Sequence, residues 1–198
     1  MPTSISENDK LLLRVIDDSW QETKEISGKL LACRPGCIEC CYGPFAINQL
    51  DAWRLREGVK ALNWVKSTAV RLRAAGAWRR MRQHFPGDPE TGILDDEGDV
   101  EGFGARYAKE PCPALDPRTE TCDLYEHRPM VCRTFGPPTS VQGERMPHCH
   151  LCYRGASPVK IEECRMEVDP ERMEDAILID IEEEGPAYGQ TVIAFVLK

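Results

Sequence analysis

Hydrophobic positions recur with helical spacing in the first part of the chain. The periodic residues are Leu12, Ile16, Trp20, Thr23, Ser27 and Leu30. Steps of three or four residues place side chains on one face of a helix. Ser4 followed by Glu7 has the spacing of a capping box, which marks a helix start. The pattern predicts an amphipathic helix over residues 6–31.

A second helical region is predicted from Asn48 to about Phe85, with Gly58 and Gly76 as points of interruption. Its cations are Arg54, Arg56, Lys60, Lys66, Arg71, Arg73, Arg79, Arg80 and Arg82. Its tryptophans are Trp53, Trp64 and Trp78, at intervals close to whole helical turns. Such a region can bind an acidic partner or RNA. We favour the simpler interpretation, in which the tryptophans are core and the cations form a solvated face.

The remaining segments carry weaker signals. Residues 86–104 are rich in Gly, Pro and Asp and predict a solvated loop or lid, since they lack the ligand spacing of a calcium loop. Asp169 and Pro170 predict the start of a helix that continues to about Glu184. The apolar tail 192–197 fits a buried strand or a helical end equally well.

Composition bounds the domain organisation. The 198 residues, 41% of them hydrophobic, suffice for one good core. We therefore expect a single cysteine-cluster domain over residues 1–198, with an N-terminal helix at 1–32, a cysteine-cluster core at 33–135 and a C-terminal extension at 136–198. The predicted fold class is mainly α, a few amphipathic helices pinned by an irregular cysteine-rich metal-binding segment.

Charge and hydropathy exclude some partners. The formal net charge of -8 argues against a general nucleic-acid binder. The N-terminal residues do not resemble a leader, and no apolar run approaches the ~20 residues of a membrane helix. We expect a cytoplasmic protein without a membrane partner. A reducing cytosol would keep the ten cysteines available to metal rather than paired as disulfides.

Four cysteines fall within nine residues, at Cys33, Cys37, Cys40 and Cys41, around a Pro-Gly turn. Thiols this close are too crowded for ordinary disulfides, so a soft metal is their simplest use. Further ligands must come from distant segments. The natural candidates sit beside turn-forming or chain-breaking residues and are Cys112, Cys122 and Cys132.

Nearby cations suit such a site. Four thiolates around one zinc ion leave a net negative charge, and an all-cysteine four-iron (4Fe–4S) cluster is likewise anionic. Arg34, Arg128 and Arg133 would stabilise either centre from the surrounding shell. Arg34 is equally well explained as a cation at the end of the first helix.

A longer pattern joins these residues. It reads Cys33, Cys37, Cys40, Cys41, then Pro111-Cys112-Pro113, then Cys122-x-x-Tyr125-x-x-Arg128-Pro129-x-x-Cys132-Arg133-x-Phe135. The pattern resembles the CxxCxxCC or YkgJ-type family of zinc- or iron-chelating proteins. Its first gap is three residues, where the family's name has two, so the assignment of Cys33 is the weakest of the seven.

The resemblance implies a metal centre more firmly than a reaction. Members of the family are labelled iron–sulfur oxidoreductases, and flagellin lysine N-methylases carry a similar cysteine pattern. The seven cysteines from Cys33 to Cys132 are the implied ligands, with Tyr125 and the arginines around them. An oxidoreductase or methylase activity is implied by this resemblance only.

Zinc and iron–sulfur both stay open. Cys37-x2-Cys40 and Cys149-x2-Cys152 are knuckle-like pairs that suit zinc. The excess of cysteine at the main cluster suits iron–sulfur slightly better. A third group contains Cys149, Cys152, Cys164, His148 and His150. It forms either a second metal site or extra ligands to the first, and Cys164 can also be a small buried hydrophobe.

Two main functional hypotheses follow. In the first, Cys37, Cys40, Cys41, Cys112, Cys122 and Cys132 hold a metal cluster of a redox or modifying protein, and Tyr125, Arg128 and Arg133 tune it. In the second, zinc stabilises a non-catalytic binding module. Metal storage or delivery is a third. The first hypothesis implies a redox or protein partner that the sequence does not identify.

Overall fold

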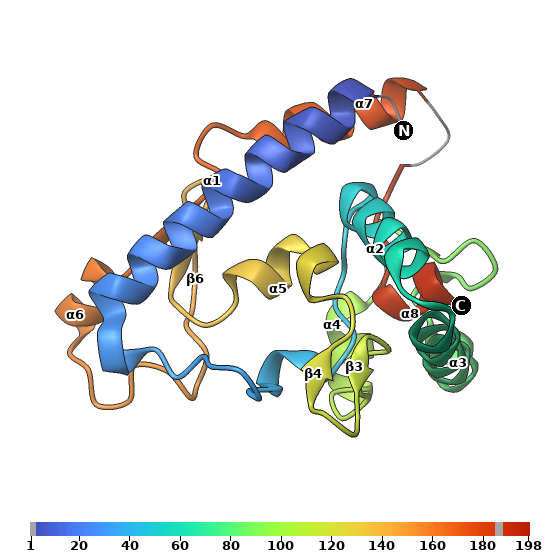
Figure 1. The fold of residues 1–198 in the computed structure, drawn as a ribbon, viewed down its shortest axis with the longest axis horizontal. Coiled ribbons are helices and arrows are strands. Elements are labelled where there is room, and N and C mark those ends of the chain that lie inside the picture. Colours follow the sequence, from blue (N-terminus) through green and yellow to red (C-terminus); the bar gives the residue numbers. More distant parts are fainter. Residues whose placement is uncertain (1–2, 185–187) are drawn as a thin grey trace. The chain divides into compact units, whose positions relative to one another are not determined.

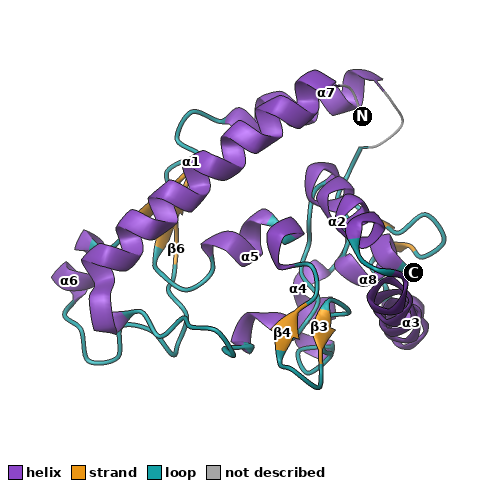
Figure 2. Cartoon of the chain, viewed as in Figure 1, coloured by secondary structure: helices purple, strands orange, loops and turns teal. Residues whose placement is uncertain are grey.

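The computed structural model describes residues 3–184 and 188–198. Helices dominate and the sheets are small (Figure 2), which confirms the mainly α prediction. The chain packs as two compact units. Unit 1 comprises Met1–Arg34 and Met130–Pro186, and unit 2 comprises Pro35–Pro129 and Ala187–Lys198. The single-domain prediction stays a prediction.

Unit 1 is built around a long N-terminal helix. Its helices are α1 (Thr3–Ser27), the 3-10 turn η1 (Gly28–Leu30), α5 (Met130–Thr134), α6 (Pro158–Glu163) and α7 (Met173–Glu184). Its strands are β5 (Thr139–Val141), β6 (Glu144–Met146) and β7 (Met166–Val168). They form a sheet of order β6-β5-β7, in which β5 is antiparallel to β6 and parallel to β7. Helices α1 and α7 lie side by side (Figure 1).

The predicted N-terminal helix is confirmed, with shifted ends. Leu12 and Ile16 are fully buried, as their spacing requires. The capping-box start is wrong, because Ser4 already lies within α1. The helix ends at Ser27 because Gly28 adopts a left-handed φ of 52°.

Unit 2 contains the other helices and two hairpins. Its helices are η2 (Glu39–Cys41), α2 (Gln49–Ala61), α3 (Trp64–Met81), η3 (Arg82–His84), α4 (Val100–Arg106), η4 (Tyr125–His127) and α8 (Ile193–Leu197). The antiparallel hairpins pair β1 (Gly87–Asp88) with β2 (Ile93–Leu94) and β3 (Leu115–Asp116) with β4 (Thr121–Cys122). The apolar tail is therefore helical, and α8 packs against α2 and α3.

Two further expectations in unit 2 need correction. The segment 86–104 is not a plain loop, since it contains the β1–β2 hairpin and α4. The tryptophans are not all core, because Trp64 is 79% exposed and Trp53 and Trp78 are half-buried. The residues of the basic region that are buried in the core are smaller ones, such as Val70 and Ala74.

The break between α2 and α3 lies at Leu62 and Asn63, not at Gly58 or Gly76. Leu62 is extended, with ψ 151°. The Asn63 side chain then caps α3, its Oδ1 accepting from the Lys66 N–H at 3.0 Å. Gly58 lies inside α2 and is buried, and only glycine fits there because a Cβ would lie 2.7 Å from the His127 side chain.

Replacing the cap should weaken α3. We expect Asn63→Ala to lower the free energy of unfolding by about 1 kcal/mol, since an orphan N–H loses its acceptor. Urea denaturation followed by circular dichroism measures this change. Asn63→Asp keeps an acceptor oxygen and should stay within a few tenths of wild type. Equal losses in both variants would contradict a capping role.

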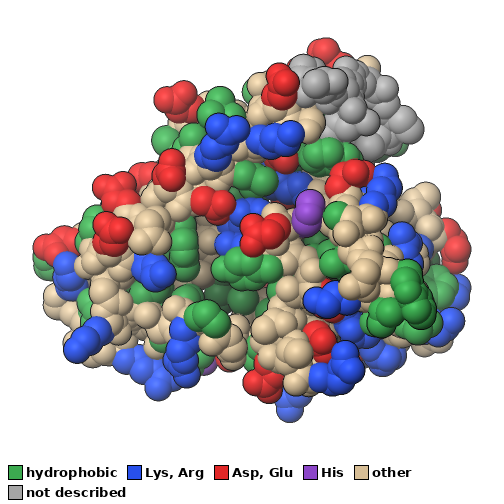
Figure 3. Space-filling model, in the orientation of Figure 1, with side chains coloured by type: hydrophobic (Ala, Val, Ile, Leu, Met, Phe, Trp, Pro, Cys, Tyr) green, Lys and Arg blue, Asp and Glu red, His purple; other side chains and the backbone are tan. Residues whose placement is uncertain are grey.

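The surface mixes charges of both signs, as the face drawn in Figure 3 shows. Within residues 3–184 and 188–198, every helix is too short or too polar to cross a bilayer.

Candidate metal centre

The thiols of unit 2 come from two segments that the backbone joins. Gly36, at φ 84°, turns the chain toward Cys37 and η2, which carries Cys40 and Cys41. The N–H of Cys112 donates to the carbonyl of Cys41 at 2.8 Å, and the neighbouring Tyr42 and Pro111 pair as an antiparallel bridge. These contacts bring the first cysteine segment beside the second, although about 70 residues separate them.

The β3–β4 hairpin brings in a further thiol. Leu115 lies opposite Cys122 in the antiparallel register, and its N–H donates to the carbonyl of Cys112 at 3.0 Å. Both Cys112 and Cys122 are half-buried and pack against the hydrophobic cluster of α2, α3 and α8. The hairpin and the residues just before it therefore hold these two thiols against the hydrophobic cluster.

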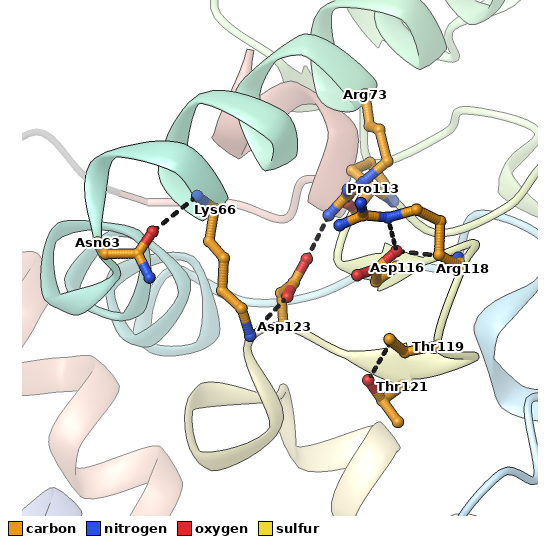
Figure 4. A network of polar contacts seen from close by, with 9 residues as sticks. All are labelled: Asn63, Lys66, Arg73, Pro113, Asp116, Arg118, Thr119, Thr121 and Asp123. Atoms are coloured by element: carbon orange, nitrogen blue, oxygen red, sulfur yellow. Dashed lines mark hydrogen bonds and ion pairs between the residues drawn. The ribbon is translucent and has the colours of Figure 1, made fainter.

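Polar contacts fasten this hairpin to α3 (Figure 4). The Asp123 carboxylate, whose side chain is 3% exposed, accepts from Arg73 Nη2 at 2.6 Å and pairs with Lys66 Nζ at 3.2 Å. Arg73 Nε also donates to the carbonyl of Pro113 at 2.7 Å. A buried carboxylate beside two cations is a strong, directional link. It fixes the segment that carries Cys112 and Cys122.

The thiols interact electrostatically with one another. Burial raises the pKa of Cys112 to about 12, and Cys122 and Cys40 act in the same direction. Burial also raises the pKa of Cys122. A hydrogen bond with Cys40 raises the pKa of Cys41, with further contributions from burial and from its thiol neighbours Cys40, Cys112 and Cys122. The backbone contacts between Cys112 and Cys41, and between β3 and β4, bring the segments of these four cysteines together.

Cys40 differs from its neighbours. The hydrogen bond with the Cys41 thiol lowers the pKa of Cys40 to about 7, and the charge of Arg128 acts in the same direction. Arg128 also opposes the rise in the pKa of Cys122. Its guanidinium stacks over the Tyr125 ring at 3.9 Å and donates to the Tyr125 carbonyl at 2.8 Å. Tyr125 thus positions a cation that favours thiolates.

The donor set of this cluster fits a soft metal. Thiolate sulfur is the preferred ligand of zinc and of iron–sulfur clusters. Across residues 3–184 and 188–198, no group of three or more His, Cys, Asp or Glu side chains is arranged so that it could hold a metal ion. The charge of Arg128 acts on two of the thiols, Cys40 and Cys122.

The other predicted ligands lie in different surroundings. Cys37 is half-buried in the turn before η2. Cys33 and Cys132 belong to unit 1, where Cys132 is half-buried on α5. Arg34 is exposed, and Arg133 is buried with its Nη1 3.0 Å from Asp17 Oδ1, within unit 1. The roles of these residues at the centre remain predictions.

The third predicted group is also in unit 1. Cys149, Cys152 and Cys164 are buried in one hydrophobic cluster, and Cys33 packs against it. His148 Nδ1 lies 2.9 Å from the carbonyl of Cys149, and His150 is exposed.

Sequence reasoning missed the residues that support the hairpin. Arg73 and Lys66 were interpreted as part of a solvated basic face, yet both bind Asp123. The position of Asp123 directly after Cys122 is the one local signal, since a buried carboxylate needs a cation.

A family model matches residues 32–153, and its description reads "putative zinc- or iron-chelating domain". The match covers more than half of the chain and contains nine of the ten cysteines, from Cys33 to Cys152. The chain belongs to the CxxCxxCC family. The resemblance stated from the sequence is thereby confirmed, and membership in the CxxCxxCC family supports metal binding in general. No curated protein and no solved structure matches the chain.

The thiols of unit 2 should differ sharply in reactivity in the reduced, metal-free chain. Thiolates are the reactive form, so iodoacetamide should modify Cys40 with half-maximal rate near pH 7, well below the ordinary thiol value of 9.0. Cys112 should stay unmodified until far higher pH, because its pKa is about 12. Peptide mapping by mass spectrometry at several pH values measures both. Parallel pH profiles for the two cysteines would contradict the shifts.

Proposed function

We propose that the chain binds a metal cluster through the thiols of unit 2 and acts as a redox or modifying protein. The ligands are Cys40, Cys41, Cys112 and Cys122, with Cys37 as a further thiol. The supporting observation is that these four interacting thiols come from two distant segments joined by backbone hydrogen bonds. An iron–sulfur cluster, of the four-iron kind, is the proposed group.

Charge supports an anionic centre at this place. Arg128 acts on Cys40 and Cys122 in the direction that favours thiolate, and Tyr125 holds its guanidinium. A cation beside the sulfurs also stabilises an all-cysteine cluster and raises its reduction potential. Arg128 is therefore the residue that we propose to tune the reduction potential of the cluster.

A cavity of about 500 Å³ adjoins one of the proposed ligands, since it is lined by Cys112 together with Tyr42, Ile38 and Arg73. Such a hollow lets a small substrate or a partner's side chain approach Cys112. Closed structural zinc sites have no need of one, so the hollow favours the redox or modifying role.

A zinc-stabilised module is the weaker candidate. Small zinc domains unfold without their metal because the metal replaces a missing core. Unit 2 has two hydrophobic clusters of its own, one around Leu55 and Val70 and another around Phe85 and Phe103. Unit 2 therefore does not need a metal ion to replace a missing hydrophobic core. A reducing cytoplasm would keep the thiols available, in line with the localisation expected above.

Anaerobic purification tests the proposal. We expect brown protein with visible sulfur-to-iron absorption and with iron and acid-labile sulfide bound to the chain. Helical circular dichroism should persist after the cluster is bleached by air. Colourless protein with stoichiometric zinc, unfolded by chelator, would instead support the zinc-stabilised module.

A further inference from the structure

The side of α3 that faces away from the core of unit 2 exposes large apolar residues. Trp64, Val65 and Leu72 are 79%, 54% and 68% exposed. Helical spacing puts them opposite Val70 and Ala74, which are buried. Figure 3 shows a hydrophobic patch over α3 with Lys and Arg side chains beside it. Single exposed apolar residues are common, but a group of them on one helix is typical of an interaction surface.

Two arginines share this side of α3. Arg71 follows Trp64 by seven residues, and Arg79 follows Leu72 by seven, which is about two helical turns in each case. Both arginines are exposed, and within the part of the chain that the structure describes neither takes part in an ion pair. The exposed apolar residues therefore lie among uncompensated positive charges.

The remaining cations of α3 already have partners. Arg73 and Lys66 bind Asp123, and Arg80 donates to Glu110 through Nε and Nη2. The charges of these three cations are compensated within unit 2. The two unpaired arginines are therefore the cations of α3 that an anion from outside can bind.

The exposed side of α3 continues into the hollow beside Cys112. Leu72 is exposed and also lines this cavity of about 500 Å³, together with Gly76 one turn further along the helix. Tyr42 and Ile38 are among the other lining residues. An apolar wall that runs from an exposed surface into a hollow suits a partner with a protruding apolar side chain.

These features favour an acidic protein over other anionic partners. A bilayer surface is flat on this scale and would leave the hollow unfilled. Single-stranded nucleic acid stacks its bases on aromatic side chains, whereas Val65 and Leu72 are aliphatic. Thr68 and Ala75 are small residues on the same side of α3 as Arg71, and they leave a gap that a ridge of a second helix can enter.

We propose that the exposed side of α3 binds an acidic amphipathic helix of a partner protein. The residues of this docking face are Trp64, Val65, Thr68, Arg71, Leu72 and Arg79. Carboxylates of the partner helix pair with the two arginines, and its apolar residues cover the exposed apolar ones. That this partner is a redox partner or a substrate protein rests on the proposed function. The binding itself does not, because it uses no metal.

Fluorescence anisotropy with a synthetic peptide tests the docking face. The probe is a labelled helical peptide of 18 residues, the length of α3, with leucines three and four residues apart and glutamates between them. We expect the wild-type chain to bind it, less tightly as salt is raised, because exposed ion pairs are screened. A scrambled peptide of the same composition should bind at least about ten times more weakly. No binding up to about 1 mM peptide, or equal binding of both peptides, would overturn the proposal.

Charge reversal on the docking face gives the sharpest variant. We expect Arg71→Glu combined with Arg79→Glu to weaken peptide binding at least about ten-fold. Lys10→Glu combined with Arg14→Glu is the matched control, because it makes the same change of charge at exposed residues of α1 in unit 1. Equal losses in the two double variants would mean that net charge alone attracts the peptide, and they would refute the docking face.

Trp64→Ala tests the apolar part of the face. We expect it to weaken peptide binding at least about ten-fold, because tryptophans at the centre of an interface contribute most to affinity. Circular dichroism checks that the helices are retained. Unchanged affinity in a folded Trp64→Ala chain would contradict a helix docked on this side of α3.

The other possible occupants are tested with the wild-type chain. A single-stranded RNA oligonucleotide and vesicles of phosphatidylcholine and phosphatidylserine are titrated in the same buffer, and light scattering follows self-association. Tighter binding of RNA or vesicles than of the acidic peptide would overturn the proposal. A dimer that Arg71→Glu combined with Arg79→Glu dissociates would also overturn it, in favour of a second copy of this chain.

Metal content separates this proposal from the proposed function. The variants of the docking face should keep the metal content of the wild type, measured by elemental analysis. A wild-type chain that binds metal but no peptide would refute the docking face alone. A chain that binds the peptide but no metal would refute the proposed function alone.

Discussion

Cys112→Ser combined with Cys122→Ser should remove the metal that we propose for unit 2. Serine preserves the size of each side chain, but its oxygen is a poor ligand for soft metals. The two cysteines lie on one hairpin and interact with Cys40 and Cys41, so their loss removes half of the interacting thiols. We expect bound metal to fall by a whole ion or cluster per chain, measured by elemental analysis and native mass spectrometry.

A control on the same hairpin separates metal loss from misfolding. Thr119 in its turn and Thr121 at the start of β4 are exposed, and their hydroxyls contact each other at 2.7 Å. Thr119→Ala should keep the metal and the helical circular dichroism. An unchanged metal content in the double cysteine variant, with the fold intact, would rule out Cys112 and Cys122 as ligands.

Asp51→Ala should cause the largest loss of stability among single substitutions in α2. Asp51 and Arg54 are each 2% exposed, and Arg54 Nη1 lies 2.7 Å from Asp51 Oδ1. Removing one partner of a buried ion pair leaves the other charge without full compensation, which costs about 3–5 kcal/mol. Urea denaturation monitored by circular dichroism measures the change in the free energy of unfolding.

The same helix offers a matched control. Lys60 and Glu57 form an exposed pair with the same spacing of three residues and a distance of 2.6 Å. Water screens such a pair, so Glu57→Ala should cost less than about 0.5 kcal/mol. Similar losses in Asp51→Ala and Glu57→Ala would show that burial does not govern the strength of the Asp51–Arg54 pair.

Periodicity predicted the helices that bury a regular stripe. Leu12 and Ile16 on α1, and Ile177 and Ile181 on α7, are buried as their spacing requires. The points where helices end were harder to predict, because a glycine inside a helix can be there to make room for a neighbouring side chain. Gly58 accommodates His127, whereas the true break depends on the cap at Asn63. Trp64 stays exposed at the first turn of α3, where helical spacing alone suggested core.

The composition of the candidate site was predictable, but its grouping was not. The cysteine spacing indicated metal chemistry, and family membership supports it. Which cysteines meet depends on long-range contacts, such as the Cys112 bond to Cys41 and the Tyr153 bond to Leu30. Nothing local in Cys33-x3-Cys37 indicates that the two residues belong to different units. Sequence spacing measures distance along the chain, and these contacts join residues far apart in it.

The link from Asp123 to Arg73 and Lys66 has a consequence for metal exchange. It orders the hairpin through the protein's own ion pairs, so the segment that carries the proposed ligands Cys112 and Cys122 is already fixed before metal arrives. The entropy of organising these ligands is then lost during folding rather than during metal uptake. We therefore expect the apo chain to be reloaded rapidly, without passing through an unfolded state.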